Sequence, residues 1–392
     1  MKVITRTSDL ALFCTEAAGH PYVTVDTEFL RERTYYAQLC LIQLAQPGDT
    51  DEGAVLVDVL AEDLDLAPLY ELFRDTSTVK VFHAARQDLE IFCVDGGVIP
   101  EPLFDTQIAA MVCGYGEQVG YETLVRAICK QGLDKSSRFT DWSRRPLSDK
   151  QMRYALGDVT HLRQIYEALA AELASSGRAD WVSEEMAILS DPATYEIRPE
   201  EAWRRVKTRS QAPRFLAVVR ELARYREEEA QRRNQPRGRI FKDDVITEVA
   251  ATRPRTLDDL AKSRLLTREA RRGEIAEAIL ASVARAMALD EADLPAVQAQ
   301  KRRKPTSESL LDLLRVLLKA RAEETGVAQR LIASAADLED LAAAESDDLA
   351  VLRGWRGRVF GADAVRLREG RIALSAADRT VRIVDLEPVE PG

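Results

Sequence analysis

The first half of the chain alternates between short apolar runs rich in β-branched residues and longer segments with a helical repeat of apolar positions. The short runs predict strands over 22–28, 36–45, 54–59 and 78–82. The helical repeats predict helices over 64–74, 84–94, 106–113, 121–131 and 148–174. Three successive strands followed by alternating helices and strands are typical of an α/β domain whose sheet is covered by helices.

The second half of the chain has a helical periodicity that occurs in two cycles. The repeat breaks over 176–210, which we interpret as a linker. Amphipathic helices then begin near 211 and again near 307. The pattern predicts two small all-α domains, over 211–292 and 305–376, and the closing residues 378–392 are expected to be frayed.

Two acids lie close together in the first long strand. Asp26 and Glu28 are two positions apart, and alternate side chains of a strand point to the same face. Neighbouring carboxylates repel each other unless a cation lies between them. Taken alone, the pair has a second interpretation, an edge strand with solvated acids.

Further acids in later segments favour a bound cation over an edge strand with solvated acids. Asp88 lies on the predicted helix 84–94, and Tyr154 and Asp158, four positions apart, share a face of the helix 148–174. Four carboxylates on three separate elements suit a pair of hard divalent cations such as Mg²⁺ or Mn²⁺, which prefer oxygen ligands. A tyrosine hydroxyl one turn from a metal-binding acid can orient a water molecule.

Three motifs of the chain resemble those of the DEDDy family of 3′→5′ exonucleases: Asp26-Thr27-Glu28, HAARQD with Asp88, and Tyr154-x-x-x-Asp158. The block DWSRRPLSDKQMRYALGDV, over 141–159, is similar to the ribonuclease D family within that group. RYREEEAQRRNQPRGRIFKDDVI resembles the HRDC domain of ribonuclease D and RecQ-type helicases, and 305–376 resembles a more diverged copy.

The resemblance implies an α/β ribonuclease H-like exonuclease domain over 1–175, followed by the linker and two HRDC-type domains. It implies a metal-dependent 3′→5′ exoribonuclease that releases 5′-mononucleotides and processes the 3′ ends of precursor tRNAs and other small structured RNAs. The implied catalytic residues are Asp26, Glu28, Asp88, Tyr154 and Asp158, of which the four acids would bind two Mg²⁺ or Mn²⁺ ions. We expect a monomer that uses no nucleotide cofactor.

The charge distribution along the chain is compatible with a nucleic-acid partner, although the net charge is negative. The net charge is −10, but residues 1–200 carry 18 basic and 33 acidic side chains, whereas residues 201–240 carry 12 and 5. A basic neighbour can hold a polyanion for an acidic catalytic domain. Candidate nucleic-acid contacts are Lys135, Arg144, Arg145, Arg232, Arg233, Arg237, Arg239 and Lys242, with ion pairing to nearby acids as the alternative.

Aromatic and histidine side chains near the motifs have two interpretations. Phe139 and Trp142 can stack on a base or anchor a loop to the core, and we favour the anchor. His83 ends a predicted strand near Asp88, where a structural hydrogen bond is favoured over a role as general base. His161 is expected to pack against its surroundings.

Several classes of protein are disfavoured by the sequence. No apolar run approaches the ~20 residues of a membrane span, so we expect a cytoplasmic protein without a membrane partner. The five cysteines include no CxxC pair, which argues against a zinc site or a disulfide framework. The glycines of 114–120 follow a predicted helix and fail the dinucleotide-binding pattern.

Two alternatives to the exoribonuclease stay open. One is a DNA-directed 3′→5′ exonuclease of the same family, since no motif reads the 2′-hydroxyl of RNA. The other is a catalytically inactive RNA-binding adaptor, against which the presence of all five implied active-site residues counts.

Overall fold

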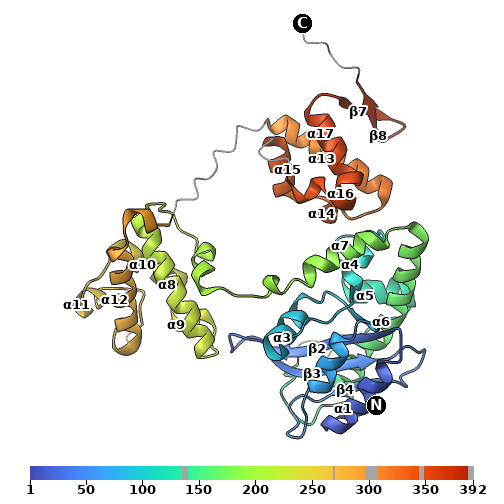
Figure 1. Cartoon of the computed structure of the whole chain (residues 1–392), viewed down its shortest axis with the longest axis horizontal. Helices are drawn as coiled ribbons and strands as arrows, with labels where there is room; N and C mark the ends of the chain where they lie inside the picture. Colours follow the sequence, from blue (N-terminus) through green and yellow to red (C-terminus); the bar gives the residue numbers. More distant parts are fainter. Residues whose placement is uncertain (135–139, 268–269, 296–306, 344–347, 387–392) are drawn as a thin grey trace. The chain divides into compact units, whose positions relative to one another are not determined.

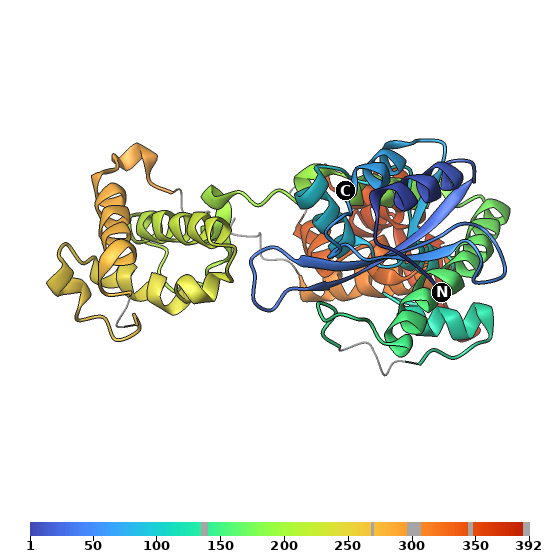
Figure 2. The same cartoon turned by 90° about the horizontal axis from the view of Figure 1, so that it is seen from below.

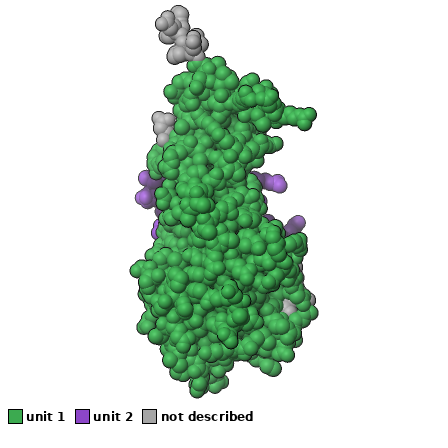
Figure 3. Space-filling model, turned by 90° about the vertical axis from the view of Figure 1, so that its right-hand side faces the viewer, with its two compact units in different colours: residues 1–28, 40–194, 302–392 green, residues 29–39, 195–301 purple. Residues whose placement is uncertain are grey.

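The computed structural model describes residues 1–134, 140–267, 270–295, 307–343 and 348–386. The chain forms two compact units, coloured separately in Figure 3. Unit 1 combines Met1–Glu28, Cys40–Thr194 and Arg302–Gly392, and unit 2 combines Phe29–Leu39 with Tyr195–Lys301. Each unit therefore contains segments that are far apart in the sequence.

A six-stranded mixed sheet forms the centre of the first domain (Figure 1). Its strands lie side by side in the order β1 (Lys2–Ile4), β4 (Ala54–Val57), β3 (Gln38–Ala45), β2 (Tyr22–Leu30), β5 (Val79–Phe82) and β6 (Leu103–Asp105). Strand β3 pairs antiparallel with β4, whereas β1 with β4, β2 with β5 and β5 with β6 pair in parallel. Val23 and Val25 of β2 are fully buried, as expected for an interior strand with both faces covered.

The helices of this domain cover the sheet and confirm the predicted α/β fold. They are α1 (Thr7–Ala17), α2 (Ala67–Arg74), α3 (Arg86–Gly96), α4 (Thr106–Val112), α5 (Tyr121–Leu124) with a π-helical turn over Val125–Cys129, and α6 (Asp149–Ser176). The sequence pattern did not predict β1 and β6, which at three residues are too short to show an alternation of apolar and polar positions. It also missed α1, although Leu10, Phe13, Cys14 and Ala17 have helical spacing and are buried.

The predicted linker over 176–210 contains ordered structure. Helix α7 (Ala179–Leu189) occupies its first part, and two 3₁₀ turns follow at Pro192–Thr194 and Pro199–Arg205. Val182 and Met186 of α7 are buried, and the sulfur of Met186 accepts a hydrogen bond from the backbone N–H of Asp105 at 3.3 Å. Helix α7 thus gains its stability from packing on the first domain, which the local pattern does not reveal.

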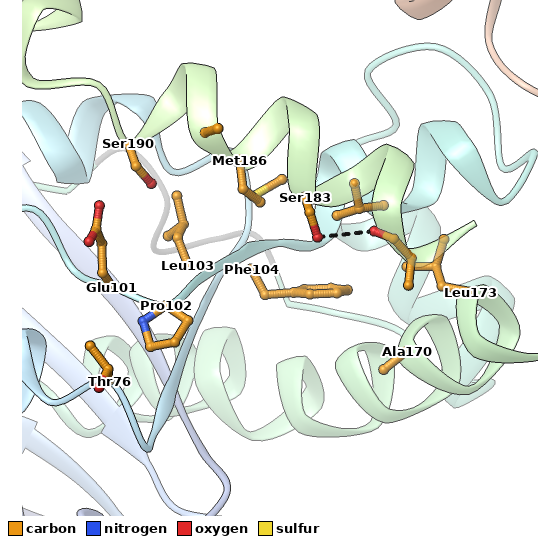
Figure 4. A pocket seen from close by; sticks show the side chains of 13 residues that line it. Thr76, Glu101, Pro102, Leu103, Phe104, Ala170, Leu173, Ser183, Met186 and Ser190 are labelled. Atoms are coloured by element: carbon orange, nitrogen blue, oxygen red, sulfur yellow. Dashed lines mark hydrogen bonds between the residues drawn. The ribbon is translucent and has the colours of Figure 1, made fainter. Parts of the chain in front are cut away.

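A pocket of about 520 Å³ lies where α7 packs beside β6 and α6 (Figure 4). Its walls include the apolar side chains of Phe104, Leu173 and Met186. None of the acids predicted to bind metal lines this pocket, so it is separate from the candidate active site.

Unit 2 is a helical domain with its own hydrophobic core. Its helices are α8 (Pro213–Arg232), α9 (Arg237–Ile240), α10 (Asp243–Thr252), α11 (Leu257–Leu260) and α12 (Gly273–Ala288). The core also includes Tyr35, from the segment 29–39 that joins β2 to β3. Figure 2 shows this segment as a loop that extends beyond the ends of the two strands. The prediction that residues 1–175 form one exonuclease domain is therefore wrong for this segment.

The last part of unit 1 is a second helical module with a separate core. It contains α13 (Glu308–Thr325), α14 (Gln329–Ile332), α15 (Ala335–Ala343), α16 (Gly354–Arg356), a π-helical turn over Gly357–Gly361 and α17 (Ala362–Arg368). The module packs on the first domain, where the rings of Trp181 and Trp355 stack 4.9 Å apart with an 8° interplanar angle. The indole N–H of Trp355 donates to Glu185 at 3.3 Å.

The expected frayed end is wrong for residues 378–385. Strands β7 (Ile372–Ala377) and β8 (Thr380–Asp385) form an antiparallel hairpin, with Ile372 opposite Asp385 and Ala377 opposite Thr380. Ile372 is buried in the core of the second helical module, which explains how a short ribbon is held in place. In the described part of the chain, no helix has both the length and the apolar character that crossing a membrane requires.

Candidate active site

Three predicted metal ligands converge in the structure. Strand β2 supplies Asp26 and Glu28, and helix α6 supplies Asp158. One carboxylate oxygen from each lies within 4.8 Å of the other two. Among the residues that the structure describes, this is the one cluster of three or more side chains with spacing suited to a metal ion. The acids that the sequence placed on one strand and on one helix therefore lie together in the fold.

Hydrogen bonds from strand β2 and from helix α5 hold helix α6 in place beside this cluster. The hydroxyl of Thr24, two residues before Asp26, lies 2.9 Å from the carbonyl oxygen of Val159. The buried phenol of Tyr121 lies 2.8 Å from the carbonyl oxygen of Asp158. Both contacts reach the backbone of α6 at or next to Asp158. They therefore fix the position of Asp158 along strand β2.

Asp88 reaches the site from helix α3, as the sequence predicted. Its carboxylate accepts a hydrogen bond from the hydroxyl of Thr27, which lies between Asp26 and Glu28 on β2. Asp88 is buried, and it is not a member of the cluster of three within 4.8 Å. It is nevertheless close enough to Asp26 for the two charges to interact.

Burial and mutual repulsion dominate the electrostatics of the site. Burial raises the pKa of Asp26 well above its ordinary value, and the negative charge of Asp158 raises it further. Burial, together with the charge of Asp26, raises the pKa of Asp88 in the same way. The pKa of Tyr121 is raised by burial and then by Asp158 and Asp26. A cation would relieve the repulsion among these partly buried carboxylates.

Tyr154 and its surroundings occupy the first turns of α6. The helix begins after Ser148, whose hydroxyl accepts from the N–H of Gln151 while the Gln151 side chain bonds back to Ser148. Trp142 is buried, and its ring centre lies 6.1 Å from that of Tyr154. Trp142 therefore anchors its loop beside the site. This is the interpretation that the sequence favoured over stacking on a base.

Comparison with known proteins identifies the family. The family model described as 3′-5′ exonuclease matches residues 1–174, and the HRDC domain model matches residues 215–283. Ribonuclease D of Jannaschia sp. (strain CCS1) is 59% identical over 98% of this chain and 99% of its own. The chain belongs to the ribonuclease D family. Ribonuclease D of Granulibacter bethesdensis is 48% identical over 97% of this chain and 96% of its own.

A solved member of the ribonuclease D family has the same fold. The crystal structure of Escherichia coli RNase D, described as an exoribonuclease involved in structured RNA processing, superimposes with a TM-score of 0.82. The two sequences are 31% identical, and the match covers 94% of this chain and 98% of the other. The ribonuclease H-like exonuclease fold followed by HRDC-type helical structure is thereby established, and the protein is a 3′→5′ exoribonuclease.

Most of the basic residues predicted to contact nucleic acid are engaged with acids. Arg145 forms two hydrogen bonds with Asp58, at 2.6 and 2.7 Å. Arg144 pairs with Asp141, Arg232 and Arg233 with Glu229, and Arg237 with Glu227. Within the described residues, the exposed side chains of Arg239 and Lys242 have no such acidic partner. Lys135 and Phe139 lie outside the described residues.

The histidines have structural contacts. Nδ1 of His83 lies 3.0 Å from the hydroxyl of Thr106, in agreement with the favoured structural hydrogen bond. Burial lowers the pKa of His83, which disfavours its charged form. The backbone carbonyl of His161 lies 3.7 Å from the sulfur of Cys129, and burial lowers the pKa of the His161 ring.

Sequence analysis of this ribonuclease D family member missed the residues that hold the acids in place. Thr24, Thr27 and Tyr121 contact α6 or Asp88 directly. A weak signal existed for the two threonines, because a polar residue at a fully buried strand position requires a hydrogen-bond partner. The sequence offered no such signal for Tyr121, which does not lie on a strand and whose hydroxyl reaches the backbone of α6 at Asp158.

Proposed function

We propose that Asp26, Glu28, Asp88 and Asp158 bind two divalent cations, Mg²⁺ or Mn²⁺, and that this centre performs the exonucleolytic cleavage. The observation that carries the proposal is the approach of Asp26, Glu28 and Asp158 to within 4.8 Å. Carboxylates this close together repel one another, and a cation bound between them would relieve that repulsion.

The chemistry of the side chains fits hard cations. All four donors are carboxylates, and carboxylate oxygens are the ligands that Mg²⁺ and Mn²⁺ prefer. The raised pKa values of Asp26 and Asp88 mean that the protein alone disfavours their ionised forms, which metal binding requires. Cysteine and histidine are absent from the described cluster, so the site does not resemble that of a structural zinc ion.

Divalent ions bound there would neutralise the phosphodiester charge and activate water for in-line attack. The protein would hold the ions from three elements at once, since β2 bears Asp26 and Glu28, α3 bears Asp88 and α6 bears Asp158. Tyr154, one helical turn before Asp158, would orient the attacking water through its hydroxyl. Cleavage of the terminal phosphodiester would release a 5′-mononucleotide.

We propose precursor tRNAs and other small structured RNAs as the substrates. Support comes from the family and from the E. coli relative, whose description names structured RNA processing. The HRDC-type domain at 215–283 would help to hold the RNA, with Arg239 and Lys242 as exposed cations. The five cysteines are unpaired, which suits a reducing cytoplasm. A monomeric state stays a prediction.

The test uses 3′-free and 3′-blocked oligomers of RNA and of DNA, each with Mg²⁺, Mn²⁺ or chelator. We expect mononucleotides from the 3′-free RNA with metal and none with chelator. Faster cleavage of DNA would favour the DNA-directed exonuclease, and binding without cleavage would favour the inactive adaptor. Digestion of precursor tRNAs followed on a gel then examines the natural substrate class.

A single substitution tests the assignment of residues. Asp26→Asn should abolish cleavage and leave RNA binding largely intact, because it removes a metal ligand and not a phosphate contact. Asp63→Asn, at an exposed acid of the same domain, is the matched control and should cleave like the wild type. Release of mononucleotides by Asp26→Asn would show that this residue is assigned wrongly.

A further inference from the structure

Two consecutive residues, Asp105 and Thr106, bind all four residues of the turn that precedes helix α3. Asp105 accepts hydrogen bonds from the backbone N–H groups of Ala84 and Ala85, at 3.0 and 2.8 Å. The hydroxyl of Thr106 lies 3.0 Å from the carbonyl oxygen of Phe82 and 3.0 Å from Nδ1 of His83. The turn 82–85 is thus tied to β6 and α4 at every residue.

The turn itself has an unusual backbone. Ala84 adopts a φ of +57°, in the left-handed region that residues with a Cβ rarely occupy. Such a conformation persists only where the surrounding structure determines it from several directions. The carboxylate of Asp105 stabilises this conformation directly, because it accepts a hydrogen bond from the N–H of Ala84.

Asp105 is itself rigidly placed. It is 2% exposed, and its carboxylate also caps α4 by accepting from the N–H groups of Gln107 and Ile108. Its own N–H donates to the sulfur of Met186 on α7. One buried carboxylate therefore joins the start of α3 to the start of α4. The backbone N–H of the same residue is bound to α7.

Helix α3 carries Asp88 in its first turn, three residues after Ala85. A helix start that moves would carry the Asp88 carboxylate with it, away from the hydroxyl of Thr27 and from Asp26. We propose that Asp105 and Thr106 are positioning residues for the metal centre, acting through the turn 82–85 on Asp88. This inference rests on the proposed role of Asp88 as a metal ligand.

The test is direct Mn²⁺ binding, measured by titration calorimetry on the full chain. Asp105→Asn retains one carbonyl oxygen but must turn its NH₂ group toward one of the backbone N–H donors, which misplaces the turn. We expect Mn²⁺ affinity to fall about 10–100-fold, as for other partners that orient metal ligands. Cleavage by this variant should fall at low Mn²⁺ and recover at high Mn²⁺, with the KM for RNA within about twofold of wild type.

Thr106→Val is the second variant, nearly isosteric and lacking the hydroxyl. It should also weaken Mn²⁺ binding. If Asp105→Asn does not fold, the Mn²⁺ affinity of Thr106→Val tests the positioning role by itself. Ser307→Ala, which removes the hydroxyl that caps α13 in the second helical module, is the matched control and should bind Mn²⁺ like the wild type. A folded variant with lowered stability and unchanged Mn²⁺ affinity would reduce Asp105 and Thr106 to purely structural residues and overturn the proposal.

Asp88→Asn separates this proposal from the function on which it depends. If Asp88→Asn binds Mn²⁺ as tightly as the wild type, the assignment of Asp88 as a ligand fails. If Asp88→Asn binds weakly while Asp105→Asn and Thr106→Val bind normally, only the positioning role fails.

Discussion

The phenol of Tyr35 donates a hydrogen bond to the carboxylate of Glu227, 192 positions further along the chain. Arg237 holds the same carboxylate with two bonds, at 2.5 and 2.6 Å, and its guanidinium lies 5.1 Å from the centre of the Tyr35 ring. The side-chain oxygen of Asn234 accepts from the N–H groups of Tyr35 and Tyr36, both at 3.1 Å. The loop that continues strand β2 beyond Asp26 and Glu28 therefore belongs to unit 2 and contributes Tyr35 to its core.

We predict that Glu227→Gln destabilises the protein by about 1–3 kcal/mol, because it removes the buried negative charge and replaces one of the two oxygens that accept from Arg237 with an NH₂ group, which cannot accept. The Glu227 side chain is 1% exposed, whereas that of its neighbour Glu228 is 52% exposed. Glu228→Gln should change the free energy of unfolding by less than about 0.5 kcal/mol. Urea unfolding compares the two variants, and equal losses would contradict a special role for Glu227.

The effect of Glu227→Gln should depend on pH. Burial opposes ionisation of Glu227, but the hydrogen bonds from Arg237 and Tyr35 outweigh it and lower its pKa. A carboxylate with a lowered pKa in the folded state contributes stability above its unfolded pKa, about 4.3, and loses it as the pH falls through the folded pKa. The stability difference between wild type and Glu227→Gln should shrink below about pH 4.3. A difference that grows in acid would contradict the assignment.

Removal of charge from the metal site should stabilise the metal-free protein. The pKa of Asp26 is raised in the folded state, so its ionisation at neutral pH costs stability. That cost is absent below the unfolded pKa of about 3.9 and develops as the pH rises through the folded pKa. In chelator at pH 7, Asp26→Asn should melt at a higher temperature than the wild type, and Asp63→Asn should not.

Metal should reverse that order. Mn²⁺ at 100 times its dissociation constant stabilises the folded state by about 2.7 kcal/mol. We expect this gain for the wild type and a much smaller one for Asp26→Asn, as read from thermal unfolding with increasing Mn²⁺. Equal gains in the two proteins would show that Mn²⁺ binds elsewhere.

Tyr154→Phe should lower kcat by about 100-fold or more, because it removes the hydroxyl that orients the attacking water. The KM for RNA and the affinity for Mn²⁺ should change little, since the ring and the four carboxylates stay in place. Tyr166→Phe, on the same helix and packed against Tyr22, is the control and should retain activity. Single-turnover cleavage is the measurement, and comparable rates for the two variants would exclude the proposed role of Tyr154.

Local spacing predicted which side chains of the candidate site lie together within a single element. The two-residue period of a strand places Asp26 and Glu28 together, and the four-residue spacing in a helix places Tyr154 beside Asp158. The same rules predicted the strand β2 and the helices α3 and α6 that carry these residues. These relationships hold within single elements, so they can be read from consecutive residues.

Only the tertiary structure decided which elements meet. The contacts of Thr27 with Asp88, of Asp105 with the turn before α3, and of Tyr35 with Glu227 join segments separated by 61, 21 and 192 positions. Helix α7 and the hairpin β7–β8 likewise depend on buried partners outside themselves. The sequence by itself determined which side chains could form a metal site. Their convergence depends on the burial of apolar surface and buried polar groups over the whole chain, which no local pattern contains.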